Sequence, residues 1–423
     1  MEWPRQASSS GKRWITHAGH DSTSDELGAL VAPRGPHLAL LREFLRGSNG
    51  KHARRQSSGR VAQMSEPKPN PTPRPKLVTL DGSRGEGGGQ ILRTALTLSL
   101  LTGRPFRLVK VRANREKPGL RPQHLTAVKA AAELGNAEVT GGVVGSRDLT
   151  FRPGDCDARD LGIDVGTAGS TALVLQTLHL PLALRANSAV RVTLTGGTFN
   201  LKAPSFPFLH HTWRAHLATL GAPVALTMPS AGFYPRGGGM LDAWIEPATL
   251  RPISLIDRGT LVRIRGEAGV ARLSSEIAER LRDRAAARLA EAGIDVAVQI
   301  DPVEWDAPSP GAAIHLSAEF SAEGLAPATF VGLGERGKPA ETVADEAVDE
   351  LLAHLSAPSA AVDPHSADQI LIPLALAEGP SAYSVSEITE HLRTNVQTIQ
   401  AFIDRPIRVE DPTETHPGRV LLS

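Results

Sequence analysis

The sequence predicts a mixed α/β protein built from repeated sheet-plus-helix units, with a smaller domain inserted late in the chain. Strand-like and helix-like segments alternate from Leu77 onward, which is the pattern of such folds. Three segments, anchored at Gln90, Ala172 and Gln369, place a small or polar residue before an apolar helix. The second spacing between these anchors is more than twice the first, so it should hold a further unit and an inserted domain. Repeats at such spacing indicate a pseudo-symmetric assembly of similar units.

The individual elements follow from apolar runs and from the turns between them. A short apolar run and a glycine turn predict a strand at 77–80 and a helix at 91–101. Further strands are expected at 106–112, 137–140, 149–152, 190–195 and 240–244, and further helices at 123–134, 170–178 and 208–220. The inserted domain is expected at 255–340, with strands at 261–265, 296–300 and 313–316 and a long charged helix at 274–293. The large domain then comprises 76–254 and 341–423.

Residues 1–75 differ from the rest of the chain. They are basic, show little hydrophobic periodicity and end in a proline-rich run at 67–75, which is typical of an extended tether. We expect a disordered basic leader with one short amphipathic segment at 37–45. An RNA-binding tail is one alternative. Translated upstream sequence, with the protein itself starting at Met64, is another.

The composition excludes several classes of protein. The 423-residue chain has a net charge of +1, so any affinity for a polyanion must come from a local patch. The single cysteine, Cys156, excludes an internal disulfide and a multi-cysteine zinc site. It predicts a reducing compartment, which we take to be the cytoplasm. No apolar run reaches the roughly 18–20 residues of a membrane span, and the first residues lack the apolar core of a signal peptide.

The run from Asp81 to Arg93 carries the strongest functional signal. Its glycines enclose Arg84 and Glu86, and it joins a predicted strand to a predicted helix. Such a turn presents backbone N–H groups and the positive end of a helix to an anion. It is not a P-loop, because no lysine follows the glycines, and it is not a dinucleotide fingerprint, because Gln90 replaces the last glycine. A plain surface turn is the alternative, but the embedded charges favour a phosphate-bearing ligand, with or without a metal ion.

A second loop, at 112–124, adds positive charge. It contains Arg112, Arg115, Lys117 and Arg121 before a Gln–His pair. Guanidinium groups bind phosphate oxygens as a rigid fork, and lysine binds them as a point charge. A solvated charged loop is the common alternative. Two such loops in one α/β unit favour phosphate binding.

Two further features carry weaker signals. The cluster Gly232–Gly239 is either a second backbone anion site or a tight entry into the strand that follows, and we assign it no catalytic role. His391 is one of 14 histidines, and polar neighbours in the sequence could orient its ring. The Gly-x-Ser-x-Gly and His-Glu-x-x-His patterns are absent from the sequence. If the protein forms a covalent nucleotide adduct, a histidine or lysine is the expected nucleophile.

Taken together, these motifs resemble those of the RNA 3'-terminal phosphate cyclases. The resemblance covers about 76–423, leaves the leader without a counterpart, and rests on the segments 81–93, 112–124, 170–176, 232–239 and 367–369. It implies a large domain of three repeated sheet-plus-two-helix units in a pseudo-threefold arrangement, with a smaller inserted α/β domain. The nucleophile would lie in the third unit.

The resemblance also implies a reaction. Enzymes of this family convert an RNA 3'-terminal phosphate into a 2',3'-cyclic phosphodiester with ATP. A histidine attacks the α-phosphorus, pyrophosphate leaves, and the histidyl-AMP then transfers AMP to the RNA phosphate. The neighbouring 2'-OH closes the ring and expels AMP. The implied partners are ATP, Mg²⁺ or Mn²⁺ and an RNA with a 3'-phosphate, with no membrane.

Residue by residue, the resemblance assigns a site. The nucleophile corresponds to His391, which lies one residue further from the Asp–Gln pair than in the family pattern, and the metal-site glutamate corresponds to Glu86. The phosphate and RNA-end residues correspond to Arg93, Arg112, Arg115 and Gln123. The nucleotide-binding residues correspond to Gln176, His365, Ser366, Ala367, Asp368 and Gln369. His365 replaces a tyrosine that stacks on adenine, and an imidazole can also stack there.

Two other functions compete with this interpretation. A non-catalytic relative acting as a ribosomal-RNA processing scaffold would share the fold but lack the nucleophile, so His391 favours an enzyme. An enolpyruvyl-transferase-like enzyme would share the architecture but not the ATP–histidine step. A neutral histidine nitrogen is a competent nucleophile near pH 7, because its ordinary pKa is about 6.5.

Overall fold

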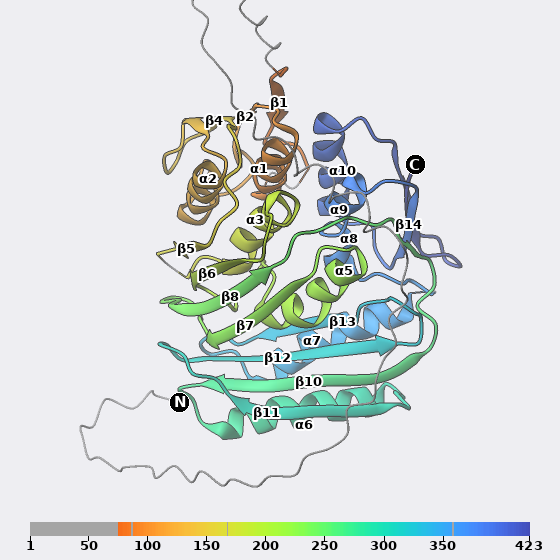
Figure 1. The fold of residues 1–423 in the computed structure, drawn as a ribbon. Helices are drawn as coiled ribbons and strands as arrows, with labels where there is room; N and C mark the ends of the chain where they lie inside the picture. The colour runs from red at the N-terminus through yellow and green to blue at the C-terminus, as the bar shows by residue number, and fades with distance from the viewer. Residues whose placement is uncertain (1–74, 86–87, 167, 358) are drawn as a thin grey trace, which may run out of the picture. The chain divides into compact units, whose positions relative to one another are not determined.

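The computed structural model describes residues 75–85, 88–166, 168–357 and 359–423, so the predicted leader lies outside the described residues except for its last position. The described part contains helices and four-stranded sheets that follow one another along the chain (Figure 1). The prediction of a mixed α/β fold is therefore confirmed.

The first sheet has the strand order β1-β2-β4-β3. Its strands are β1 (Val78–Asp81), β2 (Phe106–Val109), β3 (Glu138–Thr140) and β4 (Asp148–Arg152). Strands β1 and β2 are parallel, whereas β4 runs antiparallel to both of its neighbours. Phe106 and Phe151 face each other across β2 and β4 with their rings stacked 5.7 Å apart. Helices α1 (Gln90–Thr102) and α2 (Pro122–Leu134) bury their apolar residues in the same core.

The second and third sheets repeat this topology. The second contains β5 (Leu161–Asp164), β6 (Val190–Gly196), β8 (Gly239–Ile245) and β7 (Val224–Ser230), in that order. The third contains β9 (Ser254–Leu255), β14 (Ser381–Val385), β16 (Gly418–Leu422) and β15 (Ile407–Glu410). In each, the first pair is parallel and the other two pairs are antiparallel. The sequence repeat thus corresponds to a repeated sheet topology, while the pseudo-threefold arrangement stays a prediction.

The fourth sheet belongs to a separate core. It has the order β11 (Ala297–Glu304), β10 (Leu261–Ala271), β12 (Gly311–Phe320) and β13 (Ala328–Leu333). Helices α6 (Ser275–Glu291) and α7 (Ala340–Ser356) bury residues in this core, which is distinct from the main one. Helix α7 starts where the insert was expected to end, and β9 pairs in the third sheet although it precedes the insert. The exact domain boundaries stay predictions.

One predicted helix differs from the structure. The segment expected as a single helix at 208–220 consists of α4 (Phe206–Phe208), the π-helical segment η1 (Leu209–Trp213) and α5 (Arg214–Thr219). Within η1, the Thr212 hydroxyl lies 2.6 Å from the Pro327 carbonyl and 2.8 Å from the Thr329 hydroxyl. These partners come from the fourth sheet and the loop before β13, so the widened turn follows from a tertiary contact that local sequence does not contain.

The helices that surround the predicted site pack on one another. Helix α1 contacts α3 (Thr171–Arg185) and α10 (Glu390–Phe402), and α10 also contacts α9 (Leu371–Leu376) (Figure 1). The Thr97 hydroxyl of α1 donates a 2.8 Å hydrogen bond to the Thr177 carbonyl of α3. Residues far apart in the chain thereby meet near the first turn of α1.

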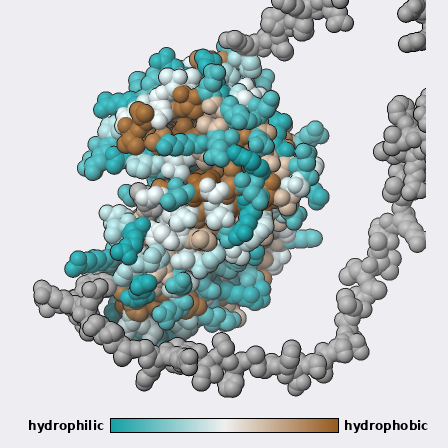
Figure 2. Space-filling model, turned by 60° about the vertical axis from the view of Figure 1, so that its left-hand side comes forward, coloured by the Kyte–Doolittle hydropathy of each residue, from teal (hydrophilic) through white to brown (hydrophobic). Residues whose placement is uncertain are grey.

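The surface of the described residues is mainly polar. Figure 2 shows hydrophilic side chains over most of one face, with smaller apolar patches between them. Across 75–85, 88–166, 168–357 and 359–423, none of the helices combines the length and the apolar character needed to cross a bilayer.

Arg258 lies just before β10, where the chain enters the inserted domain, and it bonds to the end of α7, where the chain leaves that domain. Only 9% of it is exposed, and its guanidinium donates to the carbonyls of His354 and Leu355 at 2.7 Å and of Ala357 at 3.0 Å. It also lies over the Phe320 ring, 5.4 Å from the centroid. The guanidinium of Arg258 therefore supplies hydrogen-bond donors to carbonyls at the end of α7 that have no partner within the helix.

We expect Arg258→Met to lower the free energy of unfolding by about 3 kcal/mol, because it leaves these buried carbonyls without donors. Arg263→Met is the matched control: its guanidinium is 41% exposed and pairs with Glu319, and such a pair contributes about 1 kcal/mol or less. Urea denaturation followed by circular dichroism measures both. Equal losses in the two variants would contradict the role assigned to Arg258.

Candidate active site

The glycine run approaches α2 and α10 closely at two positions. A Cβ atom at Gly89 would lie 2.3 Å from Nε2 of His124 and 2.8 Å from a guanidinium nitrogen of Arg93. A Cβ atom at Gly85 would lie 1.9 Å from the Thr394 hydroxyl, and φ there is +55°. A larger residue at Gly89 would displace the His124 and Arg93 side chains, and one at Gly85 would meet Thr394 and also strain the left-handed backbone, so glycine lets the run lie against these side chains.

The first residue of α1 connects the predicted nucleophile to the Asp–Gln pair. Gln90 is buried, its amide nitrogen donates to a carboxylate oxygen of Asp368, and its amide oxygen lies 2.6 Å from Nδ1 of His391. An amide oxygen only accepts, so Nδ1 must carry the proton in this arrangement. The lone pair of the neutral imidazole is then on Nε2. His391 is the second residue of α10, and Thr389 caps that helix.

Asn395 fixes the same network from the next turn of α10. Its amide nitrogen donates to the Asp368 carbonyl at 2.6 Å, and its amide oxygen accepts from the Thr94 hydroxyl at 2.7 Å. Both groups of the amide are therefore satisfied, and the orientation of the side chain is defined. Asn395 holds α10, α1 and the Asp368 backbone in register.

A second chain of hydrogen bonds connects α3 to the Asp–Gln pair. The amide nitrogen of Gln176 donates to the amide oxygen of Gln369, and the amide nitrogen of Gln369 donates to the His365 carbonyl at 2.8 Å. The structure therefore brings Gln176 and Gln369 together, as expected for two residues of one nucleotide pocket. Because both amides already have partners, a ligand that binds here would have to replace these hydrogen bonds with its own.

Ser366 and Ala367 fix the backbone just before Asp368 through their hydrogen bonds. Ser366 is buried, and its hydroxyl donates to Asp363 at 2.6 Å. The Asp363 carboxylate also caps α8 (Pro364–Ala367) by accepting from two backbone N–H groups. The Ala367 carbonyl accepts from the Tyr383 hydroxyl at 2.6 Å. These contacts place Asp368 and Gln369 just after a short, firmly capped helix.

His365 is exposed and paired. Its Nε2 lies 3.2 Å from a carboxylate oxygen of Glu350 in α7, and both side chains are about half exposed. The hydrogen bond that the ring donates to the Glu350 carboxylate is the main cause that raises the pKa of His365 to about 9. At neutral pH the ring is therefore charged, whereas a tyrosine in this place would be neutral.

The predicted phosphate-binding arginines lie around His124. Burial, followed by the charges of Arg93, Arg112 and Arg121, lowers the pKa of His124 to about 3. Arg112 donates to the carbonyls of Lys117 and Gly119 at 2.9 and 3.1 Å, and burial together with the charges of Arg115 and Arg121 lowers its pKa. The arginines keep their charge at neutral pH and disfavour a further charge on the buried His124, and such a cluster of cations favours an anion.

Arg93 is the cation nearest to Asp368. Burial lowers the pKa of its guanidinium to about 10, and Asp368 opposes that shift. Burial raises the pKa of Asp368 to about 7, and Arg93 opposes this shift as well. The two groups face each other across a cavity of about 80 Å³ that Gln90, Gln176 and Gln369 also line. Gln123, in the first turn of α2, is half-buried and does not line this cavity.

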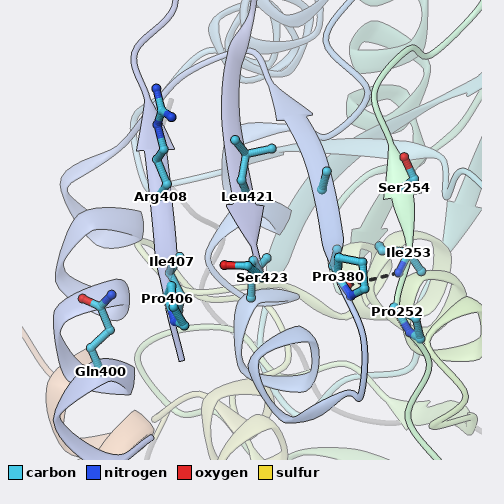
Figure 3. A pocket seen from close by; sticks show the side chains of 13 residues that line it. Pro252, Ile253, Ser254, Pro380, Gln400, Pro406, Ile407, Arg408, Leu421 and Ser423 are labelled. Carbon is cyan, nitrogen blue, oxygen red and sulfur yellow. Dashed lines mark hydrogen bonds between the residues drawn. The ribbon is translucent and has the colours of Figure 1, made fainter. Parts of the chain in front are cut away.

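A larger hollow lies elsewhere. A groove of about 860 Å³ runs along the third sheet, where Pro252, Pro380, Pro406 and Leu421 line it (Figure 3). Among the described residues that line it, Arg408 is the one with a charged side chain, and none of them is a predicted site residue. The chemistry-bearing groups therefore gather at the smaller cavity.

Motif comparison alone did not select Gln90, Asn395 or His124 as site residues. Asn395 follows His391 by one helical turn, and residues four apart share a helix face, so that spacing was a usable signal. Gln90 stood in the glycine run without an assigned role. His124 follows Gln123 directly, but only the structure shows that it is the buried member of the pair.

The predicted metal ligand Glu86 lies outside the described residues. Among the residues that are described, no group of three or more histidine, cysteine or carboxylate side chains is arranged to hold a metal ion. Asp368 is the one carboxylate among the described residues that line the cavity. The prediction of Mg²⁺ or Mn²⁺ therefore stays a prediction.

Comparison with known proteins identifies the family. A family model described as RNA 3'-terminal phosphate cyclase matches residues 84–409. The chain is 43% identical to the RNA 3'-terminal phosphate cyclase of Caldivirga maquilingensis over 335 residues, which cover 78% of this chain and 94% of that protein. It is 43% identical to that of Koribacter versatilis over 348 residues (82% and 95%) and 44% identical to that of Pseudomonas fluorescens over 335 residues (79% and 94%).

These matches agree with the motifs that suggested the family. They cover most of the chain and nearly the whole length of each relative. The matched proteins bear the name of an enzyme rather than of a scaffold or an enolpyruvyl transferase. The chain therefore belongs to the RNA 3'-terminal phosphate cyclase family of enzymes.

Proposed function

We propose that this enzyme cyclises RNA 3'-terminal phosphates with ATP, by way of an AMP covalently bound to Nε2 of His391. The observation that carries the proposal is the hydrogen bond between Nδ1 of His391 and the amide oxygen of Gln90. It holds the proton on Nδ1 and leaves Nε2 as the nucleophilic nitrogen. Because Asp368 in turn accepts from Gln90, the amide stays in the orientation that requires this tautomer.

The first step joins His391 to the nucleotide. Nε2 attacks the α-phosphorus, the bond to the leaving pyrophosphate oxygen breaks, and the imidazole keeps the proton on Nδ1. Negative charge increases on the leaving pyrophosphate. The cations around His124, with Arg93 next to the cavity, lie where they would offset that charge, and the N-terminus of α10 adds its positive end near His391.

The later steps use the RNA end. An oxygen of the 3'-phosphate attacks the AMP phosphorus, and the P–N bond to His391 breaks. The 2'-OH then attacks the RNA phosphorus, loses its proton and expels AMP. In this proposal Arg112, Arg115 and Gln123 hold the terminal phosphate, because they come from the loop and helix end that also carry His124.

ATP and a divalent cation are part of the proposal. Within the described residues the Arg93 guanidinium makes no hydrogen bond, although it is partly buried and lines the cavity, so a phosphate group suits it. A divalent cation would take Glu86 and phosphate oxygens as ligands and would supply further charge neutralisation. The single cysteine fits a cytoplasmic location, which stays a prediction.

A direct assay tests the proposed function. A 5'-labelled oligoribonucleotide with a 3'-phosphate is incubated with the protein, ATP and Mg²⁺ or Mn²⁺. We expect the end to become resistant to phosphatase and to regain sensitivity after acid opens the cyclic ester. Omission of ATP should abolish the change. A 3'-end that stays sensitive to phosphatase under all of these conditions would refute the proposal.

A further inference from the structure

The cluster Gly232–Gly239 has no part in the chemistry described above, yet it lies beside an unusual aromatic packing. It forms the connection between β7 and β8. Phe233 stacks on Phe199 with ring centroids 4.8 Å apart and planes inclined by 6°, and the Trp305 ring packs against both, 4.8 Å from Phe199 and 6.2 Å from Phe233. Phe199 and Phe233 are 2% and 5% exposed, so this aromatic stack is the buried base of the region.

Four segments meet around the aromatic stack. The loop after β6 is joined to the cluster, because the N–H groups of Thr198 and Phe199 donate to the Gly232 carbonyl at 3.0 and 3.1 Å. The loop between β11 and β12 is joined to it as well, because the Ala231 N–H donates to the Asp306 carbonyl at 2.7 Å. The end of β10 contributes the fourth segment through Arg272, which donates to the Ala307 carbonyl at 2.5 Å.

The exposed rim above the stack combines an aromatic side chain with cations. Tyr234 is 81% exposed, far more than any other aromatic residue of the described chain. Lys202, Arg236 and Arg272 are exposed on the same segments, and Asp306 is the acid among them. We call these residues, Tyr234 with the three cations, the rim. Its charge balance is therefore positive.

Backbone conformation and a hydrogen bond fix two of the rim residues in position. Arg236 donates to the Pro308 carbonyl at 3.2 Å, and Lys202 has a φ of +58°, a left-handed conformation that a lysine seldom adopts. Yet within the described residues the Tyr234 and Lys202 side chains make no hydrogen bond or ion pair. A strained backbone conformation that presents an exposed lysine is the kind of outlier that points to a functional surface.

The rim also lies near the candidate active site. Gly197 and Asn200, from the loop after β6, bond to the backbone of Gly169 and Ala168 at the start of α3. Gln176 of the nucleotide pocket lies two turns into the same helix, roughly 9 Å along its axis from Ser170. A chain bound with its 3'-end at the active site would therefore reach the rim within a few nucleotides.

We propose that the rim binds the single-stranded RNA segment that precedes the 3'-phosphate, with a base stacked on Tyr234 and phosphates paired with Lys202 and its neighbouring arginines. Single-stranded nucleic acid is bound by such combinations of exposed rings and cations. The proposal rests on the RNA 3'-end being the substrate of the site that contains His391. It assigns the cluster Gly232–Gly239 to the binding of the RNA body, whereas its sequence alone left an anion site and a strand entry open.

Two 3'-phosphorylated oligoribonucleotides with the same 3'-end, a dinucleotide and a dodecanucleotide, test the proposal. We expect Tyr234→Ala to raise the dissociation constant for the dodecanucleotide roughly tenfold and to leave the dinucleotide unchanged. Tyr234→Phe keeps the ring and should bind as the wild type does. An equal affinity of Tyr234→Ala and wild type for the dodecanucleotide, or equal losses for both ligands, would overturn the proposal.

The salt dependence of binding tests the cations separately. Lys202→Gln should reduce the slope of log affinity against log salt by about 0.7, as expected for one lost phosphate contact on a single strand. Lys129→Gln is the matched control, since Lys129 is an exposed lysine in the middle of α2, and it should keep the wild-type slope. A Lys202→Gln slope equal to that of the wild type would contradict the cationic contact.

Labelling with α-labelled ATP separates this proposal from the proposed function. In the proposed mechanism the adenylation step uses ATP and no RNA, so every rim variant should be labelled to the wild-type level. If the wild type itself is not labelled, the proposed function fails while the RNA-binding result stands on its own. If Tyr234→Ala instead changes the oligomeric state and leaves RNA affinity unchanged, the rim is a protein interface and the proposal is wrong.

Discussion

His391→Ala is expected to abolish the covalent attachment of AMP to the protein. The variant removes the nitrogen proposed to attack ATP, because Gln90 accepts from Nδ1 and the lone pair of the neutral ring is then on Nε2. After incubation with α-labelled ATP, wild-type protein should carry acid-labile label and His391→Ala should carry none. Cyclisation of a 3'-phosphorylated oligoribonucleotide should fall by at least about 10³-fold, since covalent catalysis is lost outright.

The matched control for this experiment is His416→Ala. His416 is an exposed histidine near the C-terminal strand, and its ring lies 2.8 Å from the Thr415 hydroxyl. This variant should be labelled like the wild type. Circular dichroism should show both variants folded, because His391 is exposed at the start of α10 and Thr389 still caps that helix. Full labelling of His391→Ala would refute the histidyl-AMP mechanism and require another nucleophile.

The fold was predictable from the sequence where the signal was local. The apolar run before the glycines and the helix after them lie within a residue or two of β1 and α1, and the sequence repeat corresponds to three sheets of equal topology. The π-helical turn at Leu209–Trp213 was not predictable, because its cause is a contact with residues more than a hundred positions away. Local patterns contain no information on such partners.

The same distinction between local signals and distant contacts applies to the candidate site. Residue types pointed to the arginines of the loop at 112–124, and the resemblance to the family supplied Arg93 and the Asp–Gln pair. The connection between them is a product of packing, because Gln90 lies 278 positions from Asp368 and 301 positions from His391. The sequence named Asp368 and His391 as site residues, but it gave Gln90 no role in the site. Only the meeting of α1 with α10 shows that Gln90 decides which nitrogen of His391 carries the proton.

That role of Gln90 depends on the charge of Asp368. An ionised carboxylate can only accept, so it selects the amide nitrogen of Gln90 and turns the amide oxygen toward His391. Burial raises the pKa of Asp368 to about 7, so the carboxyl gains its proton as the pH falls through neutrality. We therefore expect adenylation of the wild type to rise with pH through about 7. The rate of adenylation in a single turnover with α-labelled ATP, measured at a series of pH values, tests this rise.

Asp368→Asn should change activity and stability in opposite directions. Its amide nitrogen can donate to the Gln90 oxygen, which would turn the Gln90 amide nitrogen toward His391 and move the imidazole proton to Nε2. Adenylation should then fall roughly 10²–10⁴-fold, as in other sites where a carboxylate that fixes a histidine tautomer is replaced by an amide. The rise of the rate through pH 7 should disappear as well.

The stability of the same variant should increase. A carboxyl whose pKa is raised on folding holds a proton in the folded state that the unfolded chain has already lost, so its contribution to stability falls as the pH rises from about 4 to about 7. Above pH 7 the full penalty applies, and the neutral asparagine removes it. Thermal unfolding at pH 8 should therefore show a higher midpoint for Asp368→Asn than for the wild type, by about 2 °C or more. The two midpoints should converge near pH 4. A variant that loses both activity and stability at pH 8 would show that Asp368 is a structural anchor and not a charged residue held at an energetic cost for catalysis.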